Sequence, residues 1–325
     1  MTIDIRERTI FTLPTGTEPG ASTRTDWVWC GAIALLAWVG ALAYLGRYRP
    51  NQVAEILYRM APSDVLFWGA LGATLAVGLV ALATRRRAVG GAALVFAAFL
   101  AGHPLLELVY TFLPSALRFP FRDLDDGLAF ARARFAYGLC VLVPMLLLWA
   151  LAFGRGGWPP LALGVGDWRV RVRDLSVRSA PAPAWRELIG GYAVFCAVLF
   201  LLIQASVGFQ PLLRGTLWPV LPAVLVAAAA NGLVEELVFR GVLQPALIRA
   251  GGLTAGLWVQ GLLFGLMHWG LSVGMLAALP TSLLIGFGSV MWGKYALDTR
   301  GLAWVVVAHA MIDVAVMAAY FVPRS

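Results

Sequence analysis

Nine apolar segments, each about as long as a membrane crossing, place the strongest constraint on how this chain folds. A helix rises about 1.5 Å per residue, so roughly 20 apolar residues cross a hydrocarbon core about 30 Å thick. Helices satisfy all their backbone polar groups inside lipid, which isolated strands cannot do. The sequence therefore predicts an all-α, polytopic transmembrane helix bundle with about nine spans. The expected spans are residues 27–45, 65–84, 89–113, 135–153, 188–207, 218–239, 253–269, 271–292 and 302–322.

Composition agrees with this fold class. The 325 residues are 60% hydrophobic and 13% charged, with a mean hydropathy of +0.80, far from the averages of soluble domains. The net charge is +8, but the basic residues lie mostly in the connections, which favours a role in topology over nucleic-acid binding. Cys30, Cys140 and Cys196 lie far apart in apolar segments, so we expect packing residues rather than disulfides or a thiolate zinc site.

The connections suggest four parts of the chain. We expect a cytoplasmic polar tail at 1–26 without a removable signal peptide, a four-span N-terminal unit at 27–153, a polar linker at 154–184 and a five-span C-terminal unit at 185–325. Sixteen basic residues fall on the side of the N-terminus and nine on the other side, which predicts a cytoplasmic N-terminus. Alternating residues at 168–173 favour a short strand or a surface hairpin in the linker.

Two adjacent glutamates and an arginine interrupt one of the apolar runs. Glu235, Glu236 and Arg240 lie within six residues of each other. An ionisable group inside a spanning helix costs about 2.5–3.5 kcal/mol even on the more lenient scale, so it usually marks a functional interior. Glu236 and Arg240 are four residues apart, which predicts a buried ion pair on one helix face.

All three histidines also fall in or beside apolar segments, and His309 lies four residues before Asp313. At about 1.5 Å per residue, Glu235 lies roughly 21 Å from residue 249, and His268 lies roughly 22 Å from residue 253. These depths match only if the helix at 218–239 continues past Arg240 to about residue 249, with a kink near Pro245. We therefore expect one cavity near the middle of the membrane that collects these groups.

Three ordered motifs resemble those of the CPBP (CAAX protease and bacteriocin-processing, or ABI) family of intramembrane endopeptidases. They are Glu235-Glu236-xxx-Arg240, Phe264-xxx-His268 and His309-xxx-Asp313, and residues 298–304 resemble the approach to the last motif. The resemblance covers about residues 221–318. It implies a protease that cleaves a membrane-associated protein or peptide, with the C-terminal unit as its catalytic part. Asp313 departs from the prenyl-protease branch, which typically has Asn there.

The resemblance also implies a role for each residue. Glu235 would be the general base that activates water, and His268 would hold or polarise that water. His309 would support the oxyanion, with Asp313 fixing its tautomer. Glu236 and Arg240 would shape the site as an ion pair, or Arg240 would hold a substrate carboxylate. The cofactor would be either none or one divalent metal such as Zn, with Glu235, His268 and His309 as its ligands.

Other classes stay open at this point. They are a non-catalytic membrane immunity or scaffold protein, a proton-coupled transporter that uses both glutamates, and a rhomboid-like serine protease with Ser272 beside a histidine. There is no HExxH motif, and the GxGD string at 164–167 lies in a polar loop. His103 and Glu107 make either an interhelical polar contact near Pro104 or a substrate-facing pair. We expect a bacterial inner (plasma) membrane protein whose partners are the lipid bilayer and a membrane-embedded substrate, without nucleic acid.

Overall fold

The computed structural model describes residues 24–45, 63–112, 127–153, 164–171, 183–206, 208–268 and 275–318. In these ranges the regular elements are helices, which confirms the all-α class. They are α1 (Arg24–Leu45), α3 (Ser63–Ala83), α4 (Arg87–Phe112), α5 (Gly127–Phe153), α6 (Trp185–Ser206), α7 (Gln210–Leu213), α8 (Leu217–Glu236), η4 (Leu237–Leu243), α9 (Gln244–Met267), α10 (Met275–Thr299) and α11 (Ala303–Met317). Of the strand expected at 168–173, the described part contains one isolated bridge between Arg171 and Ala184.

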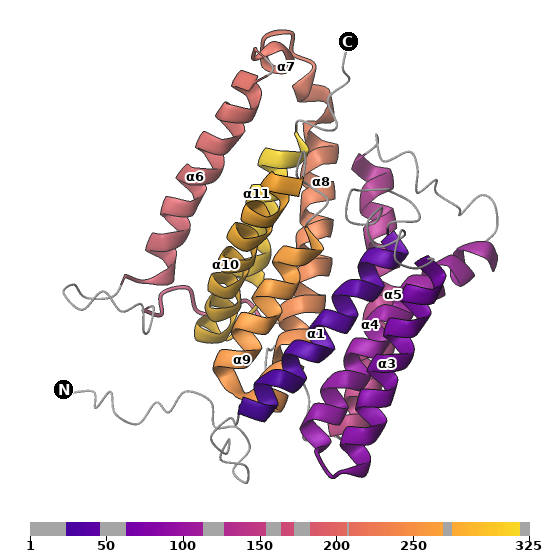
Figure 1. The fold of residues 1–325 in the computed structure, drawn as a ribbon. Coiled ribbons are helices and arrows are strands. Elements are labelled where there is room, and N and C mark those ends of the chain that lie inside the picture. The colour runs from indigo at the N-terminus through magenta and orange to yellow at the C-terminus, as the bar shows by residue number, and fades with distance from the viewer. Residues whose placement is uncertain are drawn as a thin grey trace, which may run out of the picture.

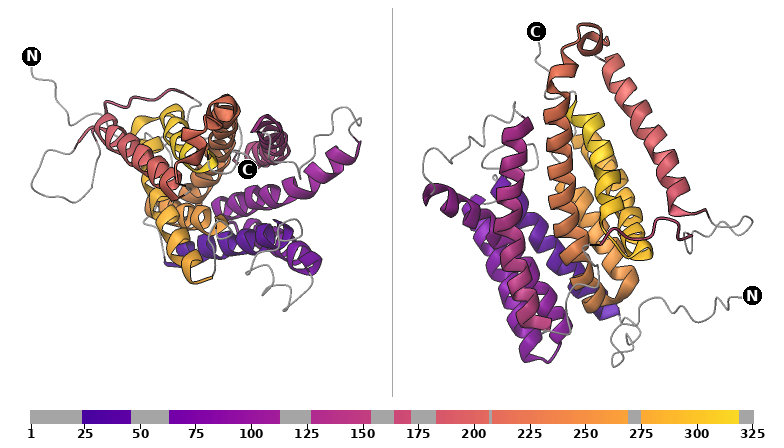
Figure 2. Two further views of the ribbon diagram at one scale, coloured as in Figure 1. Left: turned by 90° about the horizontal axis from the view of Figure 1, so that it is seen from above. Right: turned by 180° about the vertical axis from the view of Figure 1, so that it is seen from behind.

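The helices form two groups that lie side by side (Figure 1). One group contains α3, α4 and α5, and the other contains α8, η4, α9, α10 and α11. Helix α1 packs against α3, α4 and α9, while α5 packs against α8 and α4 packs against α9. The helix α6 lies at the outer edge, connected through α7 at one end and packed on α11 (Figure 2). The two groups therefore share an interface. The motif residues belong to the second group, which contains α8, η4, α9, α10 and α11.

Six helical runs of the described chain are long and apolar enough to cross a membrane. They are Trp27–Tyr44, Asp64–Ala83, Arg87–Phe112, Gly127–Phe153, Trp185–Ser206 and Leu217–Met267. The last run folds back on itself, and the apolar helix α11 is shorter, with 15 residues. The structure supports six to eight spans, so the expected number of nine is too high. The reason is that apolar stretches also fill the interior of the bundle, where a helix need not span about 30 Å.

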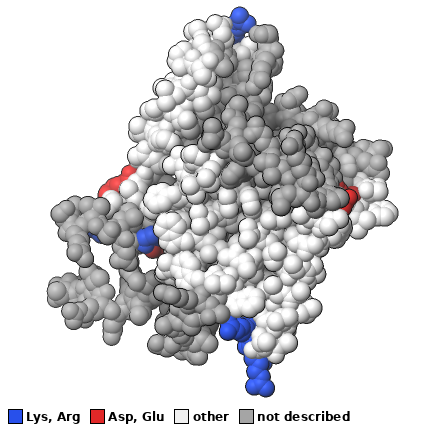
Figure 3. Space-filling view, viewed as in Figure 1, with Lys and Arg blue, Asp and Glu red and all other residues white. Residues whose placement is uncertain are grey.

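The outer surface suits a lipid environment. On the face shown in Figure 3 the described surface is mostly uncharged, with Lys and Arg at its top and bottom ends and at one edge. Large apolar side chains point outward on several helices, including Phe112, Leu151, Leu202 and Leu284. A continuous exposed apolar surface is unfavourable in water and favourable in a bilayer. The protein is an integral membrane protein.

The helix that carries Glu235 and Glu236 continues past Arg240, as the sequence predicts. Helix α8 runs through η4 into α9 without a break, and the chain reverses only at Gly252, where φ is 82° and ψ is 173°. That conformation is readily adopted only by glycine. Where the sequence predicts a kink near Pro245, the structure has the π-helical segment η4, which ends two residues before Pro245. At its end the N–H of Gln244 donates to the carbonyl oxygen of Phe239, five residues earlier. Pro245 has no N–H and its ring crowds the carbonyl four residues earlier, so a wider turn accommodates it.

Glycines allow the backbones of α9 and α10 to come into direct contact. A Cβ at Gly265 would overlap the carbonyl oxygen of Ser282, and a Cβ at Gly261 would overlap Val290. Small residues at a helix interface permit this close contact inside a membrane. As a result Ser289 of α10 lies beside the polar side chains Arg240 and Gln260.

Candidate active site

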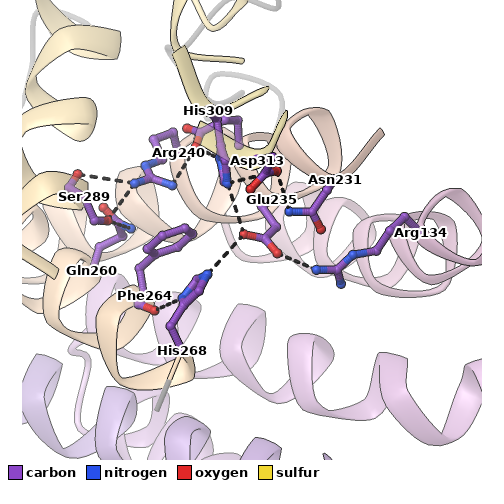
Figure 4. Close-up of polar contacts among 11 residues, drawn as sticks. Arg134, Asn231, Glu235, Arg240, Gln260, Phe264, His268, Ser289, His309 and Asp313 are labelled. Atoms are coloured by element: carbon purple, nitrogen blue, oxygen red, sulfur yellow. Dashed lines mark hydrogen bonds and ion pairs between the residues drawn. The ribbon is translucent and has the colours of Figure 1, made fainter. Parts of the chain in front are cut away.

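Glu235 lies near the end of α8, at the centre of a cluster of polar side chains (Figure 4). Its Oε1 accepts a hydrogen bond from Nη2 of Arg134. Its Oε2 lies 3.6 Å from Nε2 of His309 and 3.9 Å from Nε2 of His268. Within the described part of the chain this oxygen is buried and makes no hydrogen bond. One oxygen of the carboxylate is therefore paired with a cation, and the other faces two imidazoles.

His268 follows the last residue of α9 and returns to the depth of Glu235 because the chain reverses at Gly252. Its Nδ1 lies 2.7 Å from the carbonyl oxygen of Phe264, one turn earlier. The carbonyl can only accept, so Nδ1 carries a proton and Nε2 is the nitrogen turned towards Glu235. The Phe264 ring also packs against the imidazole, with 4.6 Å between the ring centroids.

His309 is buried on α11, and its two nitrogens contact three carboxylates. Nδ1 lies 2.8 Å from Oε1 of Glu236, whereas Nε2 lies 3.7 Å from Oδ2 of Asp313. The geometry therefore assigns the orienting contact to Glu236, on another helix. This differs from the expectation that Asp313 fixes the tautomer. The cause is the direction of the ring, which points Nδ1 from α11 towards α8.

The expected ion pair between Glu236 and Arg240 is confirmed. Both side chains are fully buried, and Nη1 of Arg240 donates to Oε1 of Glu236 at 2.8 Å. Nη2 of Arg240 donates to Oγ of Ser289 at 2.6 Å, and Gln260 donates to the same oxygen. The guanidinium also lies over the Phe264 ring, 4.4 Å from its centroid. Because Arg240 is enclosed and paired, the structure favours its ion-pair role over binding of a substrate carboxylate.

Two residues of the cluster were not anticipated from the sequence. Asn231, one turn before Glu235, donates from Nδ2 to Oδ2 of Asp313 at 2.9 Å. A lone amide in an apolar run, four residues before an acidic one, was the signal for it. Arg134 was assigned to the connection before the span at 135–153, but α5 already begins at Gly127, so Arg134 lies inside a helix.

The position of His103 is explained by packing between helices. His103 is buried on α4, its Nδ1 lies 3.1 Å from the carbonyl of Phe99, and its Nε2 lies 3.4 Å from the hydroxyl of Tyr137 on α5. The hydroxyl of Tyr44 on α1 donates to its backbone carbonyl. These contacts confirm that His103 makes an interhelical polar contact near Pro104. No contact joins His103 to Glu107 in the described structure, and Ser272 lies outside the described residues.

The donors expected to hold a metal do not form a metal site in the described ranges. No group of three or more His, Cys, Asp or Glu side chains is placed there to hold an ion. Glu235, His268 and His309 supply the right donor types for Zn, but Arg134 is bound directly to the Glu235 carboxylate. A guanidinium at that distance repels a divalent cation. The Arg134 contact therefore disfavours a divalent cation at Oε1 of Glu235.

Residues 216–315 match the model of a protein family described as type II CAAX prenyl endopeptidase Rce1-like. The matched segment extends from the start of α8 into α11. It includes the six motif residues Glu235, Glu236, Arg240, His268, His309 and Asp313. No curated protein and no solved structure matches the chain. Through this segment, which covers just under a third of the chain and brings the three motifs together at one buried site, the protein is similar to the CPBP (CAAX protease) family of intramembrane endopeptidases.

Proposed function

We propose that the protein hydrolyses a peptide bond of a membrane-associated protein or peptide with a water molecule activated by Glu235. The supporting observation is the position of Glu235 Oε2, which faces Nε2 of His309 at 3.6 Å and Nε2 of His268 at 3.9 Å. These separations are too long for direct hydrogen bonds. They suit one water that contacts all three atoms, and polar groups at such distances are commonly bridged in this way.

In this mechanism Glu235 takes a proton from the water as the oxygen adds to the carbonyl carbon of the scissile bond. The carbonyl oxygen becomes a tetrahedral oxyanion. Glu235 then passes the proton to the amide nitrogen, the C–N bond breaks, and a carboxylic acid and an amine leave. The protein supplies one base that later acts as an acid, and no redox step is involved.

The histidines divide the remaining tasks. His268 has Nδ1 engaged by the Phe264 carbonyl, so its Nε2 lone pair accepts a hydrogen bond from the water and orients it. His309 has Nδ1 engaged by Glu236, and in the doubly protonated form its Nε2 donates to the oxyanion. Asp313, held by Asn231, lies 3.7 Å from the same Nε2 and compensates the positive charge of that ring.

The Glu236–Arg240 pair fixes the orientation of the His309 ring. Oε1 of Glu236 contacts both Arg240 and His309 at 2.8 Å, so one carboxylate oxygen links the ion pair to the imidazole. Fixing a catalytic ring through a buried partner lowers the cost of reorganisation when charge develops.

We further propose that the enzyme works in the plasma membrane of a bacterium with its N-terminus in the cytoplasm.

We expect activity to be independent of a bound metal. The Arg134 guanidinium on Glu235 opposes a divalent cation at the same carboxylate. Purified protein in lipid vesicles is treated with a high-affinity chelator, dialysed and assayed for peptide cleavage, with and without added Zn. Full activity after chelation is expected. Loss of activity that only Zn restores would show that the carboxylate leaves Arg134 and ligates a metal.

Comparing the membrane peptides of two strains tests the function directly. One strain carries the wild-type protein and the other carries Glu235→Ala. We expect at least one protein tail or peptide to accumulate uncleaved in the variant and its fragment to disappear. A non-catalytic scaffold or immunity protein predicts identical peptides and an unchanged phenotype. A transporter predicts identical peptides together with loss of solute flux driven by a pH gradient in vesicles.

A further inference from the structure

We propose that Arg134, contributed by the N-terminal group of helices, is a positioning residue for the carboxylate of Glu235. The proposal rests on the function of Glu235 proposed above. Arg134 lies on α5, outside the matched segment 216–315, and its Nη2 donates to Oε1 of Glu235 across the interface between α5 and α8. The three motifs alone therefore do not contain every side chain that contacts the base.

The guanidinium is held where it meets Glu235. The rings of Phe130 and Tyr137, one turn to either side on α5, lie 5.5 Å and 5.8 Å from the guanidinium carbon. Such contacts between a cation and an aromatic face are attractive. Arg134 keeps 29% of its side-chain surface exposed and Glu235 keeps 12%, so the pair lies at the edge of the buried cluster. Figure 4 shows Arg134 approaching Glu235 from the side away from His268.

Close packing sets the distance between the two helices. A Cβ at Gly127 would lie 2.6 Å from the carbonyl oxygen of Ala223, and a Cβ at Gly138 would lie 2.9 Å from the Val234 side chain. Both distances are shorter than real Cβ contacts, so α5 and α8 approach this closely only because these positions are glycine. Gly127 and Gly138 lie on either side of Arg134 in the sequence, and together they fix where its side chain starts.

The contact determines which oxygen of Glu235 is available. A carboxylate has two equivalent oxygens, and a charge-assisted hydrogen bond to one of them fixes its rotation. With Oε1 held by Arg134, Oε2 faces His268 and His309 at distances that leave room for water. Without Arg134, the carboxylate is free to turn and pair directly with an imidazole. Direct pairing would remove the position from which water is activated.

The experiment uses the full-length protein in lipid vesicles and a fluorogenic peptide spanning a cleavage site identified in wild-type membranes. The variants are Arg134→Gln, Arg134→Lys and Arg134→Ala. Arg132→Gln is the matched control, because it removes the same charge from an exposed position two residues away on α5. We expect Arg134→Gln to lower kcat about 10- to 100-fold, with KM changed by less than about twofold. Arg134→Lys should retain part of the activity, and Arg132→Gln all of it.

Chemical rescue separates positioning from a structural role. Guanidinium ions at millimolar concentration should restore part of the activity of Arg134→Ala, since the site is partly exposed, and should not affect Arg132→Gln or Glu235→Ala. Wild-type kcat in Arg134→Gln would overturn the proposal, as would an effect confined to KM, which would indicate substrate binding. If Arg134→Gln does not fold, Arg134→Lys at or below the background of Glu235→Ala overturns it as well. No difference between wild type and Glu235→Ala would instead refute the proposed function.

Discussion

Replacing Glu235 by Gln is expected to lower kcat for peptide cleavage by about 10²- to 10⁴-fold, the usual contribution of a general base. The amide has nearly the same size and can still accept a hydrogen bond from Arg134 through its oxygen. It cannot take a proton from water. The loss should therefore appear in kcat, with a small change in KM, and the thermal unfolding temperature should stay close to that of wild type. Steady-state kinetics with the protein in lipid vesicles measures the effect.

Glu107→Gln is the control for this substitution. Glu107 lies on α4, and it takes no part in the described contacts around Glu235. The same chemical change there should leave kcat unaltered. Substantial turnover by Glu235→Gln, with correct folding shown by an unchanged melting temperature, would mean that another group activates the water. His268 would then be the next residue to test.

Arg240→Leu is expected to destabilise the protein by about 3–5 kcal/mol, because it leaves the Glu236 carboxylate buried without its cation. Both side chains are fully buried, so water cannot replace the lost partner. The substitution should also abolish cleavage, since Glu236 orients His309 through the same oxygen that accepts from Arg240. Equilibrium unfolding of the protein in detergent gives the change in free energy of unfolding.

The double variant Glu236→Leu with Arg240→Leu sharpens this prediction. Removing both charges should recover most of the lost stability, because neither member of the Glu236–Arg240 pair is left buried without the other, and Asp313 still lies 3.7 Å from Nε2 of His309. Activity should not return, since His309 loses its orienting carboxylate. Recovery of activity as well as stability would contradict the role assigned to Glu236.

The pair Lys294 and Asp298 provides a comparison with the same spacing on α10. Nζ of Lys294 lies 3.1 Å from Oδ2 of Asp298, but the lysine side chain keeps 20% of its surface exposed and the aspartate side chain keeps 11%. Asp298 also accepts from Nε1 of Trp185, so it keeps a partner when the lysine is removed. Lys294→Leu should therefore cost less than about 1 kcal/mol. A loss as large as that of Arg240→Leu would show that burial does not explain the difference.

The sequence predicted the long helix better than it predicted the span count. Placing Glu235 and His268 at one depth required a helix that continues past Arg240, and α8, η4 and the first part of α9 form it. Hydrophobicity alone overcounted the spans, because it does not distinguish a segment in lipid from one packed inside the bundle. It also located the start of α5 too late, at residue 135, since charged side chains there lowered the local hydropathy although the helix begins at Gly127.

The sequence by itself determined the fold class, the resemblance of residues 216–315 to a protein family and the six motif residues, because ionisable groups in apolar helices are costly and therefore informative. It also determined the Glu236–Arg240 pair, since residues four apart share one face of a helix. Only the tertiary structure decided which helices supply the remaining contacts: Arg134 to Glu235, Glu236 to His309 and Asn231 to Asp313. Spacing along one helix carries no information about a partner about 70–100 residues away, which depends on how closely two helices pack and how each is rotated.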